Sequence, residues 1–99
     1  MVRISWTILA RNDLKGIAEY IARDSAYYAK IQVQRIILKT KILKLQPYSG
    51  RMVPEVNEES VRELIEGNYR IIYEIINNNH LEILTIHHSS RDLNQRKFL

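Results

Sequence analysis

The chain of 99 residues contains no cysteine, only three glycines and only two prolines. Without cysteine it forms neither disulfides nor thiolate metal sites, which excludes the small secreted folds that disulfides hold together. Its longest unbroken apolar run is the tetrapeptide at 26–29, far below the ~20 residues of a membrane span. The first residues also lack the apolar stretch of a signal peptide. We therefore expect one cytoplasmic domain over residues 1–99, with no metal and no cofactor.

Charge is unevenly distributed along the chain. The net charge is +4, and 45% of the residues are apolar and 26% charged, which is typical of a folded globular protein. Between Ser25 and Pro54 every charged residue is basic: Lys30, Arg35, Lys39, Lys41, Lys44 and Arg51. A segment with charges of one sign indicates either an acidic or polyanionic partner or a solvated helix face.

The first half of the sequence predicts a short strand and two helices. Apolar residues alternate with polar ones over residues 2–7, the pattern of a strand with one apolar face. Thr7 is placed to cap a helix whose apolar side chains recur at three- and four-residue spacing: Ala10, Leu14, Ile17, Ala18 and Ile21. Asp24 and Ser25 end this helix and offer a cap for a second one over residues 26–45.

The second half predicts a sheet. Residues 51–59 are expected to form an irregular connection, followed by strands at 60–66, 69–76 and 80–88. Gly67 and Asn68 form a two-residue hairpin turn, and three asparagines make the next turn. The last eleven residues suit a loop or a single helical turn. The predicted fold is α+β with the order β-α-α-β-β-β, a helical hairpin packed on a small, mostly antiparallel sheet.

The second predicted helix has an unusually wide apolar arc. Part of this arc, formed by Ile31, Leu38, Ile42 and Leu45, exceeds what one face of a sheet covers. With the nearby Lys39, Lys41 and Lys44 it predicts a groove for an amphipathic partner segment with acidic flanks. The alternative is a helix that packs against two neighbours at once.

Several short motifs occur in a characteristic order over residues 3–92. They comprise Trp6-Thr7, Ala10, Asp13-Leu14, Tyr20-Ile21, Leu43 with Pro47, Gly50-Arg51, Arg62-Glu63-Leu64, the strand 69–73, and the ending 83–88 with Arg91-Asp92. In this order the sequence resembles the RelE/ParE toxin superfamily of type II toxin–antitoxin systems. The resemblance implies a growth-inhibiting toxin of a plasmid stabilisation-type module. It also implies that a cognate antitoxin binds the toxin in a hetero-oligomer and neutralises it.

The resemblance leaves two activities open. RelE-like toxins cut messenger RNA on the ribosome, and in them arginines corresponding to Arg70 and to a position near Arg91 hold the phosphate. The same branch has a pair of lysines where this chain has Arg62 and Leu64, and it has a C-terminal tyrosine where this chain ends in Phe98-Leu99. ParE-like toxins instead poison DNA gyrase.

The missing lysines and tyrosine favour the ParE-like branch, with DNA gyrase as the target. In that case Arg62, Arg70 and Arg91 are candidates for binding the target or a phosphate. If the nuclease alternative holds, the catalytic candidates are Arg70, Arg91 and His88, since an imidazole can serve as acid or base near neutral pH. Strand alternation predicts that His88 shares a face with Leu84 and Ile86. A third possibility is a small basic binding module without toxicity.

Overall fold

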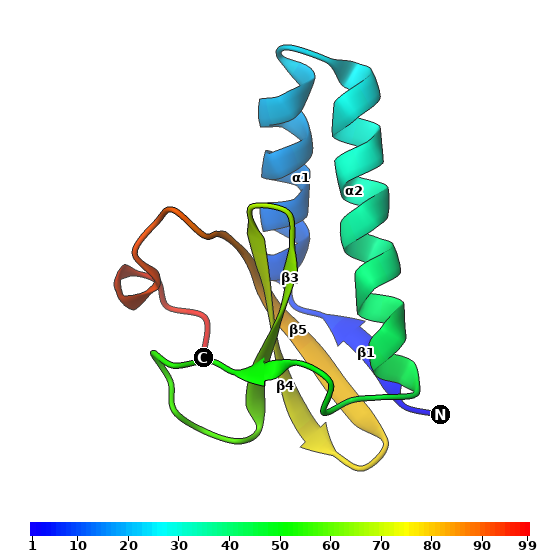
Figure 1. The fold of residues 1–99 in the computed structure, drawn as a ribbon, viewed down its shortest axis with the longest axis vertical. Helices are drawn as coiled ribbons and strands as arrows, with labels where there is room; N and C mark the ends of the chain where they lie inside the picture. Colours follow the sequence, from blue (N-terminus) through cyan, green and yellow to red (C-terminus); the bar gives the residue numbers. More distant parts are fainter.

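The computed structural model describes all residues, 1–99, as two helices and a five-stranded sheet (Figure 1). The elements are β1 (Arg3–Trp6), α1 (Ile8–Ala22), α2 (Ala26–Lys41), the 3₁₀ turn η1 (Ile42–Lys44), β2 (Arg51–Met52), β3 (Val61–Glu66), β4 (Tyr69–Asn77), β5 (His80–His88) and the 3₁₀ turn η2 (Leu93–Gln95). The predicted α+β class and the order β-α-α-β-β-β are confirmed, with β2 as an additional short strand. Neither helix is long and apolar enough to cross a membrane.

The predicted helix caps are also present. The Thr7 hydroxyl accepts the N–H of Ala10, and the Ser25 hydroxyl accepts the N–H of Tyr28, which satisfies donors that have no partner within the helix. The second helix is shorter than the predicted 26–45. It ends at Lys41 and tightens into η1, because Pro47 lies just beyond and cannot continue a helix.

The strand order in the sheet is β1-β5-β4-β3-β2. The pair β1–β5 is parallel and all other pairs are antiparallel. In this order β4 is the central strand, as its run of apolar and aromatic residues predicts. The tight turn between β3 and β4 depends on Gly67, whose φ of 58° is accessible to glycine at little cost.

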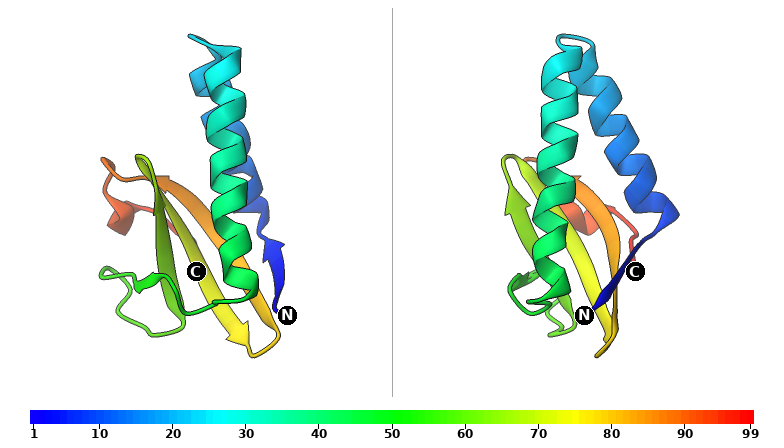
Figure 2. Two further views of the ribbon diagram at one scale, coloured as in Figure 1. Left: turned by 45° about the vertical axis from the view of Figure 1, so that its right-hand side comes forward. Right: turned by 90° about the vertical axis from the view of Figure 1, so that its right-hand side faces the viewer.

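The sheet is buried on both faces. On one face the helices cover a core formed by Ala10, Ile36, Leu43, Tyr69, Ile71, Tyr73, Leu81, Ile83 and Ile86. On the other face a smaller core is formed by Val53, Val61, Ile72, Leu84 and Leu93. Figure 2 shows the helical hairpin on one side of the sheet and the β2–β3 connection on the other.

The connection 51–59 is not wholly irregular, so this part of the prediction is wrong. Arg51 and Met52 form β2 and pair with Glu63 and Arg62 of β3. The Nε of Arg51 also donates a 2.5 Å hydrogen bond to the Glu63 carboxylate. Both contacts join residues far apart in sequence, so no local pattern reports them.

A β-bulge at Leu84 corrects the predicted faces of β5. Ile72 of β4 pairs with Thr85, whereas the next residue, Tyr73, pairs with Ile83, so Leu84 is the extra residue. Ile83 and Ile86 consequently both contribute to the helix-side core, and Leu84 packs in the core on the other face. The prediction that His88 shares a face with Leu84 is therefore wrong, whereas His88 does share the face of Ile86, two residues before it.

β1 is shorter than its neighbour β5, and side chains take over where β1 ends. β1 pairs only with residues 80–83 of β5. Beyond this point the Thr7 hydroxyl donates to the Leu84 carbonyl at 2.8 Å. The Asp13 carboxylate of α1 accepts the backbone N–H of Ile86 at 3.1 Å and the hydroxyl of Thr85. These contacts satisfy backbone groups that a longer β1 would otherwise pair.

Candidate functional site

Arg70, the strongest candidate for holding a phosphate, is bound by two carboxylates of this chain. Its Nε donates to Glu63 at 2.6 Å, and Nη1 and Nη2 each donate to one oxygen of Glu55 at 2.7 Å. The side chain of Glu63 is fully buried and that of Arg70 is 10% exposed. The contact with Glu55 is thus the two-point arrangement that matches a guanidinium to a carboxylate.

The electrostatics keep Glu55 and Arg70 charged. The paired hydrogen bonds from Arg70 lower the pKa of Glu55 to about 2. The same hydrogen bonds, with the one to Glu63, raise the pKa of Arg70 further above its already high usual value. Since Glu55 and Glu63 both lie on the guanidinium, its positive charge is compensated within the chain. In the conformation described, Arg70 has little capacity for an external phosphate.

Arg62 is held mainly by backbone carbonyls. Its Nε donates to the carbonyl of Glu59 at 2.9 Å and its Nη1 to that of Gly50 at 2.9 Å. The guanidinium also lies 5.0 Å from the ring centroid of Tyr48. These contacts fasten the segments before β2 and before β3 to each other, so Arg62 contributes to the architecture of the chain.

A cleft of about 790 Å³ lies between α1 and the end of β5 together with the residues after it. We call it the α1–tail cleft, where the tail is residues 89–99, which follow β5. It is lined by Asn12, Asp13, Gly16, Ile17, Tyr20, Tyr69, Ile86, His87, His88, Ser90, Arg91, Asp92, Gln95 and Arg96. The structure therefore brings the candidates His88 and Arg91 together in one cleft. Arg62 and Arg70 do not line it.

Both histidines at the end of β5 are hydrogen-bonded. Nδ1 of His88 accepts from the backbone N–H of Ser90 at 3.2 Å and lies 2.6 Å from the Ser90 hydroxyl, and its ring meets Tyr69 edge-to-face at 5.3 Å. Burial raises the pKa of the Tyr69 phenol. His87 is buried, with Nε2 located 2.9 Å from the Arg91 carbonyl. His87 thus fixes the backbone at Arg91.

The sequence did not single out the remaining residues of the cleft as a site. Arg96 forms a 2.8 Å salt bridge with Asp13, which ties the tail to α1. Gly16 is exposed, and a β-carbon added there would have no atom within 4 Å. The one available signal was this glycine, since glycine is unfavourable in the interior of a helix.

The residues expected to contact a partner on α2 are mostly exposed. Leu38, Ile42 and Leu45 are 61%, 45% and 78% exposed, Lys41 is exposed, and Ile31 and Lys39 are half-buried. Ile31 and Leu38 are seven residues apart on α2 and therefore lie on one line along the helix. Ile42 and Leu45 follow at the start of η1 and at its C-terminal cap. We call Ile31, Leu38, Ile42 and Leu45 together the α2 ridge.

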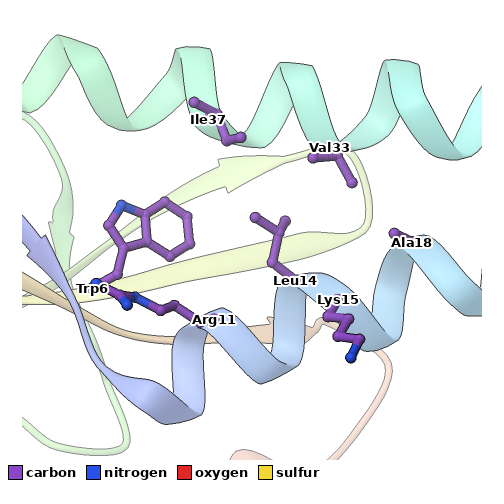
Figure 3. A pocket seen from close by; sticks show the side chains of 7 residues that line it. All are labelled: Trp6, Arg11, Leu14, Lys15, Ala18, Val33 and Ile37. Carbon is purple, nitrogen blue, oxygen red and sulfur yellow. The ribbon is translucent and has the colours of Figure 1, made fainter.

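A separate apolar groove of about 410 Å³ lies between the two helices. It is lined by Trp6, Arg11, Leu14, Lys15, Ala18, Val33 and Ile37. Figure 3 shows the side chains of Leu14, Val33 and Ile37 pointing into the space between the helices, with the Trp6 ring at one end. The sequence predicted an apolar surface on α2 but did not predict that Trp6 lies at the end of a groove.

The family of the chain follows from comparison with known proteins. The sequence model of the family described as "ParE toxin of type II toxin-antitoxin system, parDE" matches residues 4–93. The chain belongs to the ParE toxin family. A chain from the solved chromosomal ParDE TA system of P. aeruginosa is similar to it, with 25% identity and a TM-score of 0.73 over 89% of this chain and 96% of that one. No curated protein matches. The ParE-like resemblance is thus confirmed, and the chain is a toxin of the type II toxin–antitoxin class.

Proposed function

We propose that this ParE-family toxin arrests growth by acting on DNA gyrase, within a plasmid stabilisation-type module. We further propose that its cognate antitoxin neutralises it in a hetero-oligomer. The single observation that carries the choice of target is the double salt bridge of Arg70 with Glu55 and Glu63. A ribonuclease needs cations free to stabilise the charge that develops on the phosphate, and here the candidate cation is already neutralised.

The rest of the nuclease set is equally incomplete. Leu64 has no acid–base chemistry, and residues 92–99 include no tyrosine. Arg62 donates to carbonyl groups rather than projecting into the α1–tail cleft. These features support a toxin that acts by binding, since binding to a protein target requires no acid and no base.

The proposed antitoxin-binding surface is the α2 ridge. Its apolar side chains are flanked by Lys39 and Lys41, and no acidic residue lies between Ser25 and Pro54. An amphipathic segment with an apolar stripe and acidic flanks would match this surface in both respects. A second copy of this toxin would not match it, because the lysines of two copies would repel each other.

The deciding experiment compares the two targets directly. Purified toxin should inhibit supercoiling by DNA gyrase or trap gyrase–DNA complexes, and it should leave messenger RNA intact on translating ribosomes. In cells, DNA synthesis should stop before protein synthesis after induction. Cleavage of messenger RNA on the ribosome by the wild type, lost in Arg91→Ala with an unchanged melting curve, would instead establish the RelE-like alternative. Absence of any growth arrest would favour the non-toxic binding module.

A further inference from the structure

We propose that the α1–tail cleft is where the toxin contacts its protein target, and that it receives a carboxylate side chain lying beside an apolar one. This inference rests on the proposed function in so far as it needs a target protein, but it does not depend on that protein being gyrase. The cleft lies between α1 and the tail, whereas the α2 ridge lies on the other helix. Target and antitoxin would therefore use different surfaces.

The first observation is a glycine without a structural reason. Gly16 lies in the middle of α1, where glycine is the least favourable residue after proline. Glycine within a helix usually permits a close approach of another element, but nothing lies within 4 Å of a β-carbon placed at this position. Gly16 does line the cleft. The absence of a side chain at Gly16 therefore leaves space on the α1 side of the cleft, where a ligand can approach the helix backbone.

The second observation is an unpaired cation at the same cleft. The other arginine of the lining, Arg96, is neutralised by Asp13. Arg91 takes part in none of the salt bridges of the chain. Its backbone is nevertheless held on both sides, because its N–H donates to the His88 carbonyl at 3.0 Å and its carbonyl lies 2.9 Å from Nε2 of His87. The chain thus positions the base of this side chain and leaves its charge available.

The lining also indicates which kind of partner fits. Ile17 and the exposed Tyr20 supply apolar surface, and Asn12 and Gln95 supply neutral polar groups. Strong nucleic-acid binding relies on several cations that each neutralise a phosphate, whereas this cleft has one unpaired arginine and also contains Asp92. One carboxylate beside an apolar side chain, as on the surface of a protein, satisfies the lining better. Arginine and tyrosine are also the residues that often dominate protein–protein binding.

The test fills the cleft without damaging the helix. Gly16→Leu places a bulky side chain on the cleft wall, and leucine is a good helix former, so the melting temperature should stay equal or rise. Toxicity should nevertheless fall. The toxin concentration for half-inhibition of gyrase supercoiling should increase by roughly tenfold or more, the effect of losing one good contact. The matched control is Ala22→Leu, which adds the same side chain at an exposed position of α1 outside the cleft.

The charge of the cleft is tested separately. Arg91→Glu should cause a comparable loss of inhibition at an unchanged melting temperature, and Arg91→Lys should retain most of it. Full potency of both Gly16→Leu and Arg91→Glu, with intact folding, would overturn the assignment. So would a Gly16→Leu variant that loses antitoxin binding and keeps its toxicity, because the cleft would then serve the antitoxin.

Two further outcomes separate this inference from the proposed target. If Gly16→Leu abolishes growth arrest but the wild type never inhibits gyrase, the gyrase proposal fails and the cleft assignment stands. If the wild type does not arrest growth, both fail. Fluorescently labelled single-stranded DNA and RNA oligonucleotides serve as the last probe. Binding that the wild type shows and Gly16→Leu lacks would replace the protein ligand with a nucleic acid.

Discussion

Gly50 and Tyr73 approach each other so closely that no side chain fits between them. The Gly50 N–H donates to the Tyr73 phenol at 3.0 Å, and the phenol donates to the Pro47 carbonyl at 2.7 Å. A β-carbon at position 50 would lie 2.6 Å from both the Tyr73 hydroxyl oxygen and the Glu63 carbonyl oxygen. The segment between α2 and β2 is therefore fastened to the central strand by a contact that only glycine permits.

Gly50→Ala should destabilise the fold by ~1–3 kcal/mol, because the new methyl group must displace backbone or the buried phenol. Gly16→Ala is the matched control, since its β-carbon meets nothing. That change should stabilise α1 by ~0.5–1 kcal/mol, as alanine is the better helix former. Urea unfolding of both variants measures the two effects, and equal changes in the same direction would contradict the close contact at Gly50.

Removing Glu55 should cost stability because it leaves a nearly buried arginine with one carboxylate fewer. We expect Glu55→Gln to lower the free energy of unfolding by ~1–3 kcal/mol. This is less than for a fully buried pair, because the Glu55 side chain is 25% exposed. Glu58→Gln, an exposed neighbour without a salt bridge, should have little effect. A melting temperature of Glu55→Gln equal to that of the control would show that the salt bridge contributes nothing.

The same pair predicts a dependence of stability on acid. The pKa of Glu55 is lowered from 4.5 to about 2 on folding, so the folded state binds its proton less readily than the unfolded state does. The stabilisation is complete above pH 4.5 and is lost as the pH falls towards 2. The unfolding free energy of the wild type should therefore fall more steeply over this range than that of Glu55→Gln. Parallel pH profiles of the two proteins would contradict the lowered pKa.

Adjacent residues of α2 should respond differently to truncation. Ile36 is fully buried in the helix-side core, whereas Ile37 is 37% exposed and lines the groove between the helices. Ile36→Ala should cost ~2–5 kcal/mol as a core deletion, and Ile37→Ala should cost clearly less. Thermal melting of both variants tests this order.

Arg91→Ala belongs in the same series and should leave the melting temperature nearly unchanged, because an exposed charge contributes little to stability.

Acidic substitutions on the α2 ridge should weaken neutralisation by the antitoxin. Leu38→Asp and Ile42→Asp replace exposed apolar side chains with charges that would repel acidic flanks and remove the apolar contact. Co-expression of toxin and antitoxin, with growth as the readout, should show lost rescue for both variants. Ala22→Asp, on the other helix, should remain neutralised. Full rescue of the ridge variants would place the antitoxin elsewhere.

The features that the sequence predicted correctly are those set by neighbouring residues. Thr7 and Ser25 cap helices within three residues, and Gly67 turns the chain within a hairpin. The bulge at Leu84 was missed because alternation along β5 is interrupted by its pairing with β4, which no local pattern records. Tertiary contacts of this kind override periodicity.

The features of the candidate site also fall into those that local sequence predicts and those that depend on the fold. His88 and Arg91 are close in sequence, and they do line one cleft. Arg70 could be recognised as a buried strand cation, but its partner Glu55 lies in a connection whose path depends on the packing of Val53 and Val61. The compensation of its charge could therefore be found only in three dimensions. The surroundings of Gly16 also depend on the fold, because the tail residues that line the same cleft lie far from Gly16 in the sequence.

The carboxylate of Asp13 has a consequence for how the sheet can grow. Beyond the end of β1, β5 would present an open edge, and open edges are templates for pairing with another chain. Asp13 occupies the N–H of Ile86 there, and Thr7 occupies the carbonyl of Leu84. An incoming strand would find these groups already bonded. At this edge the toxin is thus protected against strand-to-strand aggregation by two side chains from the turn and helix that follow β1.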